Sequence, residues 1–170
     1  TGPRVSELVA SQPPHGRARH SVAWAGEETS ENWMNIGREY TERWHHQMQI
    51  REAVGAPPLL ERRWLHPLLD LSVRALPRAY AEVDAPAGTA VVLEVPGDAG
   101  GAWSVVREDG GWRVDRGAAG NAAARVRMEP GDVWKMFFNA LDPARAAAAA
   151  AVTGDARLAE PLFRARSVMV

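Results

Sequence analysis

The segment 38–51, REYTERWHHQMQIR, contains a carboxylate and an imidazole with the spacing of a metal-ligand pair. Glu42 and His46 are four residues apart, and residues at positions i and i+4 lie on one face of an α-helix. Zinc and similar divalent ions accept imidazole nitrogen and carboxylate oxygen, and a catalytic zinc site typically has three protein ligands and one open position. The pair therefore supplies two such ligands. Exposed Glu and His pairs with this spacing are also common on helices, so spacing alone leaves both interpretations open.

The composition argues against several classes of function. The 170 residues include no cysteine, so any thiol chemistry needs a thiol from another molecule. Lys and Arg number 20 against 21 Asp and Glu, and the arginines are dispersed, which argues against nucleic acid and anionic membranes as partners. No apolar run reaches the roughly 20 residues of a membrane span, and the N-terminus lacks a signal-peptide pattern. We therefore expect a cytoplasmic protein.

The metal-ligand pair lies in the strongest predicted helix of the chain. Ser30 is a suitable N-cap, and Glu31 would lie in the first turn. The helix can continue to about Val54, because Gly55 and the two prolines that follow at 57 and 58 end it.

Two stripes run along this helix on nearly opposite sides, since each residue turns the helix by about 100°. The apolar stripe is expected to pack, so the polar stripe faces either water or a site. His45 is turned about 100° from His46, and we expect it to pack or to face solvent. The apolar stripe is Trp33, Ile36, Tyr40 and Trp44, and the polar stripe is Glu39, Glu42, His46 and Gln49.

The rest of the sequence predicts helices first and an α+β unit afterwards. A short helix over 3–10 and a long connection over 11–28 precede the main helix, and a second helix is expected over 59–75. From Gly88 the hydrophobic period changes to two, and the Asp109-Gly110-Gly111 turn indicates a hairpin within an antiparallel sheet. Strands are predicted over 89–95, 102–107, 112–115, 125–128 and 150–153, and helices over 132–139, 143–149 and from 154 onward.

Several motifs together resemble the mycothiol-dependent maleylpyruvate isomerase family. They are WAGEE at 24–28, SxxW at 30–33, the segment 38–51, AVGxP at 53–57 and the leucines with an aspartate around 68–70. The motifs GGWRV at 110–114, VWKMF at 133–137 and TGDARLA at 153–159 resemble the second domain of that family, which is similar to sterol-carrier proteins.

The resemblance implies two parts in an α+β protein. Residues 1–57 would be the C-terminal part of a DinB-like four-helix bundle, and residues 58–170 a sterol-carrier-like α+β domain with a linking helix over 58–80. The first helices of the bundle have no counterpart here, and the chain begins with Thr1 rather than Met. We therefore expect a fragment or a truncated homologue.

The resemblance also implies roles for particular residues. Glu42 and His46 match two metal ligands on the last bundle helix of the family, whose third ligand is a histidine on the absent second helix. His15 or His20 could in principle replace that histidine. Gln49 stands where the family often has Asp, and it could orient His46 or a substrate.

The family further implies an arginine in the second domain that binds a substrate carboxylate. Arg157 and Arg164 are our candidates for this role.

The function implied by the resemblance is thiol chemistry at a divalent metal. A metal ion, here expected to be zinc, deprotonates a coordinated thiol. Bound mycothiol could then isomerise a small electrophilic substrate from cis to trans, or be transferred to it. We expect an isomerase or thiol S-transferase that has little activity alone, because three ligands are normally needed. The alternative is a non-catalytic binding or interaction module that retains the fold. An apolar face left by the missing helices would favour it, or would drive self-association that rebuilds a bundle from two copies.

Overall fold

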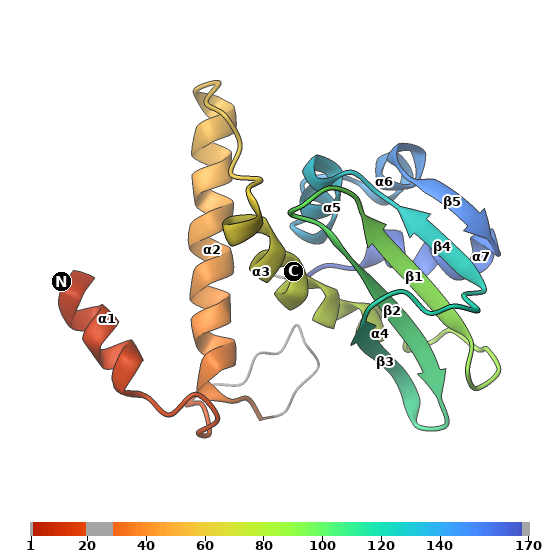
Figure 1. Ribbon diagram of the computed structural model, residues 1–170, viewed down its shortest axis with the longest axis horizontal. Coiled ribbons are helices and arrows are strands. Elements are labelled where there is room, and N and C mark those ends of the chain that lie inside the picture. Colours follow the sequence, from red (N-terminus) through yellow and green to blue (C-terminus); the bar gives the residue numbers. More distant parts are fainter. Residues whose placement is uncertain (1, 20–28, 168–170) are drawn as a thin grey trace.

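The computed structural model describes residues 2–19 and 29–167. Two helices at the N-terminal end stand beside an α+β unit, as Figure 1 shows. The first helix, α1 (Gly2–Ser11), has no buried residue and stands apart from the rest of the protein. None of the described helices is both long and apolar enough to cross a bilayer.

The long helix α2 (Asn32–Ala53) begins one residue later than a cap at Ser30 requires. Glu31 occupies the N-cap position and makes no side-chain capping hydrogen bond, so the predicted cap was wrong. The predicted C-terminal end was correct, because Val54 is the C-cap and Gly55 adopts a positive φ of 67°.

The linking segment is helical over most of its length. Helix α3 (Arg62–Ser72), a 3-10 turn (Val73–Ala75) and α4 (Leu76–Ala79) follow one another without a break. The leucines of this segment at positions 65, 68, 69 and 76 are fully buried. The segment therefore contributes directly to the hydrophobic core.

A five-stranded sheet forms the centre of the α+β unit, in the order β3-β2-β1-β4-β5. Neighbours β1 and β2, β2 and β3, and β4 and β5 are antiparallel, but β1 and β4 are parallel. The sheet is therefore mixed rather than antiparallel throughout, because turn residues fix the direction of consecutive strands only. The strands are β1 (Ala90–Val95), β2 (Gly101–Glu108), β3 (Gly111–Arg116), β4 (Ala124–Arg127) and β5 (Ala151–Gly154).

The remaining helices pack on this sheet. They are α5 (Pro130–Phe137), α6 (Pro143–Ala149), α7 (Ala156–Ala159) and a 3-10 turn (Glu160–Arg164). The predicted cap of α6 is confirmed, because the Asp142 side chain accepts a hydrogen bond from the backbone N–H of Arg145 at 3.0 Å. Side chains fill the interface between helices and sheet, and those of Trp103, Trp134 and Phe137 are at most 2% exposed.

Helix α2 shares this core rather than standing free of it. The Trp44 ring meets the Trp134 ring of α5 edge to face, with centroids 5.3 Å apart. At the end of α2, the Glu52 carboxylate and the Lys135 amine form an ion pair at 2.7 Å. These contacts hold α2 against α5 and fix which of its faces remains open to solvent. The domain boundary between residues 57 and 58 stays a prediction.

Candidate metal centre

The polar stripe of α2 brings Glu42 and His46 together. His46 Nε2 lies 3.8 Å from Glu42 Oε2, and the two side chains are 63% and 33% exposed. With metal–ligand bonds of about 2.0–2.2 Å and a tetrahedral angle, a nitrogen and an oxygen on one zinc ion lie about 3.4 Å apart. The pair is therefore close to the separation that a shared ion requires, and small side-chain rotations suffice to reach it.

Gln49 fixes the state of the His46 ring. Its Oε1 atom lies 2.9 Å from His46 Nδ1. An amide oxygen only accepts hydrogen bonds, so Nδ1 donates to it, and in the neutral ring the lone pair is then on Nε2, on the side of Glu42. A metal-binding histidine commonly has its other nitrogen held in this way. The arrangement is thus the one that a ligand imidazole would need.

The buried face of α2 differs in part from the predicted apolar stripe. Trp44 is buried as expected, but Ile36 is 39% exposed, so that part of the prediction was wrong. Glu42 and His46 do lie away from the buried face, as predicted. The buried residues are Met34, Gly37, Thr41, Trp44, His45 and Met48.

His45 packs in the interface between α2 and α5, which settles the choice between packing and solvent. Its ring centroid lies 4.8 Å from that of Phe138, and its Nδ1 has no hydrogen-bond partner among the described residues. Burial lowers the pKa of His45, and the neighbouring His46 lowers it further. His45 is therefore a packing residue, and its ring also stacks on that of His46 with centroids 5.7 Å apart.

No third ligand joins the pair within the described part of the chain, where no group of three metal-binding side chains occurs. His15 lies near the start of α2 and bonds to the Glu31 carboxylate at 2.9 Å. His20 lies outside the described residues. The donor pair thus fits a divalent ion in atom types and separation, and provides two of the usual three ligands.

The two candidate arginines lie in the C-terminal turns of the α+β unit, on α7 and the 3-10 turn after it. Arg157 bonds to Asp155 at 3.0 Å, and Arg164 pairs with Glu160. In Figure 1, helix α7 lies at the right-hand end of the molecule beside β4 and β5, and α2 lies at the left. The structure does not bring Arg157 to the Glu42–His46 pair, and a carboxylate-binding role for either arginine stays a prediction.

Two cavities beside α2 were not predicted from the sequence. One, of about 750 Å³, lies between α1 and α2 and is lined by Val9, Ile36, Tyr40 and Arg43 among others. Residue spacing could not predict this cavity, because α1 and α2 are separated by a long connection whose course the spacing does not reveal.

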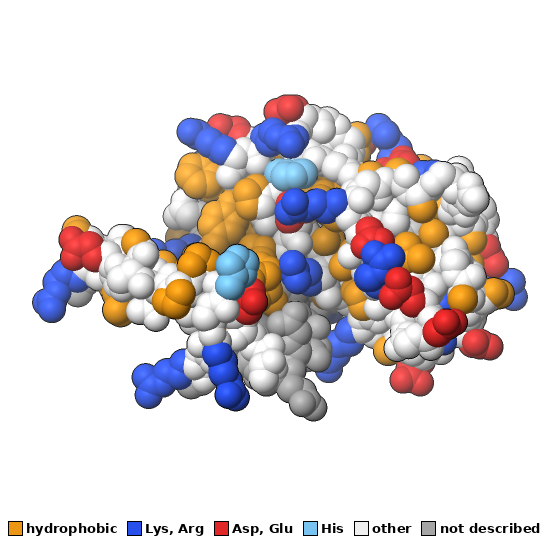
Figure 2. All heavy atoms as spheres, turned by 60° about the horizontal axis from the view of Figure 1, so that its bottom comes forward, with side chains coloured by type: hydrophobic (Ala, Val, Ile, Leu, Met, Phe, Trp, Pro, Cys, Tyr) orange, Lys and Arg blue, Asp and Glu red, His pale blue; other side chains and the backbone are white. Residues whose placement is uncertain are grey.

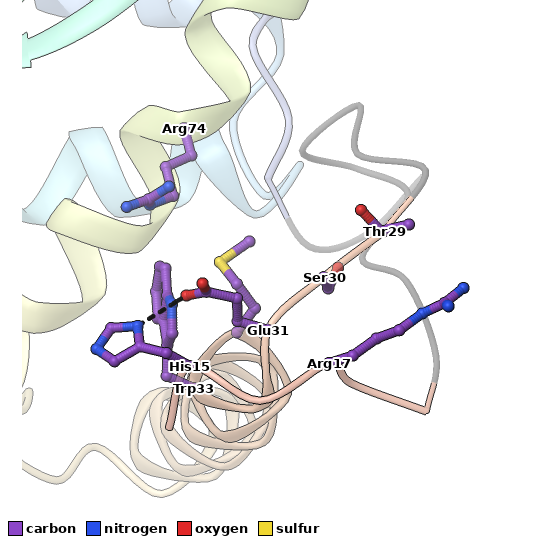
Figure 3. A pocket seen from close by; sticks show the side chains of 8 residues that line it. His15, Arg17, Thr29, Ser30, Glu31, Trp33 and Arg74 are labelled. Carbon is purple, nitrogen blue, oxygen red and sulfur yellow. Dashed lines mark hydrogen bonds and ion pairs between the residues drawn. The ribbon is translucent and has the colours of Figure 1, made fainter. Parts of the chain in front are cut away.

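The second cavity, of about 580 Å³, lies at the start of α2. Figure 3 shows Arg74 facing Trp33, His15 and Glu31 across it. The guanidinium carbon of Arg74 is 4.6 Å from the centre of the Trp33 ring. Hydrogen bonds from His15 and from Trp33 lower the pKa of Glu31. These contacts tie His15, in the described part of the connection, to the start of α2.

Comparisons with known proteins find similar solved structures but no family model and no curated relative. No protein-family model matches the sequence, and no curated protein matches it. Among solved structures, the chain is similar to sterol carrier protein 2 like 2 from Aedes aegypti, with 19% identity and a TM-score of 0.42, over 56% of this chain and 93% of that one. It is also similar to a UbiJ-SCP2 ubiquinone synthesis protein, with 20% identity and a TM-score of 0.37, over 53% and 74%.

A third similar structure is the sterol carrier protein domain 2 of Helicoverpa armigera. Its identity is 17% and its TM-score 0.36, over 59% of this chain and 78% of that one. With such identities and TM-scores, function has to be argued from the residues of this chain. The resemblance to mycothiol-dependent isomerases continues to rest on sequence motifs.

Proposed function

We propose that this chain belongs to a metal-dependent enzyme that applies a low-molecular-weight thiol to a small electrophilic substrate. One observation carries the proposal, namely the arrangement of Glu42, His46 and Gln49 on the open side of α2. The His46 ring is held by Gln49 so that its free nitrogen and the Glu42 carboxylate face one another at 3.8 Å. Two acceptors placed so close are best satisfied by a cation between them.

Each of the three residues has a separate task in this proposal. His46 supplies a neutral nitrogen, Glu42 supplies an oxygen and one negative charge, and Gln49 keeps the ring in the correct tautomer. A bound divalent ion, zinc in the first instance, lowers the pKa of a thiol that coordinates it. The partial exposure of Glu42 and His46 leaves room for that thiol.

The thiol has to come from another molecule, because the chain contains no cysteine. Mycothiol is the thiol that the sequence resemblance implies. An isomerase and a thiol S-transferase both need an activated thiol, and differ in whether the substrate keeps it. The same three residues therefore serve either activity.

The second candidate is a non-catalytic binding module for a small apolar molecule. The cavity between α1 and α2 favours it, since its volume is about 750 Å³ and its lining includes Val5, Leu8, Val9 and Ile36. Cavities of this size and character are typical of small-molecule sites. In this case the exposed Glu42–His46 pair would be an ordinary surface pair.

A zinc titration of the whole chain by calorimetry separates the two candidates. We expect binding that weakens at least tenfold in His46→Ala and clearly in Glu42→Gln. The matched control is His15→Ala, because His15 is another exposed histidine paired with a glutamate. Zinc binding that is unchanged in His46→Ala would refute the metal assignment and leave the binding module.

A further inference from the structure

The ligand pair on α2 amounts to half of a tetrahedral coordination set. The described residues supply Glu42 and His46 and no third ligand, whereas a closed zinc site has four. Both side chains are reachable from outside, with 33% and 63% of their surfaces exposed. The missing ligands can therefore arrive on another molecule.

We propose that two copies of this chain share one divalent ion, each contributing Glu42 and His46. The proposal rests on the metal-binding role proposed above. A two-fold axis midway between the two residues makes the two α2 helices antiparallel. It places Glu42 of one copy opposite His46 of the other, and the reverse. The four side chains then form one set of two oxygens and two nitrogens, which suits a tetrahedral zinc ion.

The charges make this association depend on the metal. Without a cation, the axis brings two Glu42 carboxylates together, with Glu39 of each copy one turn away on the same stripe. Like charges at such distances repel, so the metal-free chains stay apart. The two positive charges of one divalent ion neutralise the two Glu42 carboxylates. Both carboxylates are then attracted to the shared ion.

Apolar surface lies beside the pair and could be covered by a second copy. Glu39 lies one turn before Glu42 and also lines the cavity between α1 and α2. Helix α1 exposes Val5, Leu8 and Val9, at 47%, 62% and 38%. Figure 2 shows hydrophobic side chains along this projecting helix and on the surface next to it. A helix this short is marginal alone in water, so it gains from a partner.

The shared ion would differ from the one in a working thiol site. Four protein ligands fill a tetrahedral ion and leave no open position for a thiol. The metal-linked dimer is thus a resting form of the proposed enzyme, in which self-association occupies the position needed for catalysis.

Light scattering coupled to size-exclusion chromatography tests the proposal on the whole chain. We expect a monomer in EDTA and a dimer after zinc is added, with saturation at one ion per two chains. His46→Ala and Glu42→Gln should remain monomeric in zinc, while His15→Ala should dimerise like the wild type. Thermal unfolding in EDTA serves as the folding control, because both substituted side chains are on the surface.

Each result decides between sharing and its alternatives. One ion per monomer, lost in His46→Ala, would overturn sharing and leave the proposed metal role intact. A dimer that persists in EDTA or in His46→Ala would overturn sharing as well. Zinc binding that is unchanged in both His46→Ala and Glu42→Gln would overturn the two proposals together. Replacing zinc by Co²⁺ adds a spectroscopic check, since four-coordinate binding in the dimer should give an intense visible absorption.

Discussion

The Nδ1 atom of His46 lies 2.9 Å from the Oε1 atom of Gln49, three residues further along α2. The contact determines the tautomer of the histidine, because an amide oxygen cannot donate. The lone pair on Nε2 is thereby directed toward Glu42, 3.8 Å away. In the proposed function, cation binding therefore depends on a residue that does not itself bind the cation.

Substitution of Gln49 tests this dependence. In Gln49→Ala the ring loses its fixed tautomer, and we expect zinc affinity to fall about tenfold to a hundredfold. Gln49→Asp keeps an acceptor at that position and should retain or strengthen binding. Calorimetric titration measures both, with the exposed neighbour Gln47→Ala as the control. Equal affinities in all three variants would contradict the positioning role.

Asp70 should be the most sensitive polar residue of the linking segment. Its carboxylate accepts hydrogen bonds from Trp103 Nε1 at 2.8 Å and from Arg116 at 2.8 Å. Asp70→Ala leaves the indole N–H of the buried Trp103 without a partner, which costs about 2 to 3 kcal/mol of unfolding free energy. Asp70→Asn keeps an acceptor and should cost less. Urea unfolding followed by tryptophan fluorescence compares them, and an equal loss in both variants would refute this explanation.

Tyr80 ties α4 to the C-terminal turns. Its fully buried hydroxyl donates to the carbonyl of Leu158 at 2.7 Å. Tyr80→Phe leaves that carbonyl without this donor and should lower the free energy of unfolding by about 1 to 2 kcal/mol. Chemical unfolding near neutral pH measures the difference, and a variant as stable as the wild type would show that the hydrogen bond contributes nothing.

Tyr80 should also make the free energy of unfolding depend on pH in the alkaline range. Burial raises the pKa of Tyr80 well above its usual value of 10.0. The folded state then holds its proton where the unfolded state releases it, so this stabilisation is present below pH 10 and is lost as the pH rises further. Unfolding curves in buffers on both sides of pH 10 should show a steeper loss in the wild type than in Tyr80→Phe. Parallel curves would contradict the assignment.

Gly154 is expected to tolerate no side chain. Its φ is 83°, and a Cβ there would lie 2.2 Å from the backbone oxygen of Ala123. Gly154→Ala should therefore disrupt the pairing of β4 with β5 and destabilise the protein by more than 2 kcal/mol, roughly twice the usual backbone effect of a glycine. Gly131→Ala in α5 is the matched control, because its Cβ would meet nothing within 4 Å. Thermal unfolding of both variants provides the measurement, and similar melting temperatures would refute the clash.

The sequence by itself determined the elements whose signals are local. The helical repeat placed Glu42 and His46 on one face, and the turn residues at Asp109 and Gly110 specified a hairpin that the structure contains. The Asp142 cap was equally readable. In each case the interacting groups lie within a few residues of one another, so a short stretch of sequence contains the whole interaction.

The tertiary structure decided everything that depends on distant surfaces meeting. The parallel pairing of β1 with β4, the burial of His45 against Phe138 and the exposure of Ile36 could not be read from spacing. A helical stripe predicts which residues share a face, but the contacts of α2 with α5, more than 80 residues away along the chain, select the face that is buried. That selection left the Glu42–His46 pair open to solvent. Packing energy depends on the shapes of both contacting surfaces, and the sequence pattern of α2 describes only one of them.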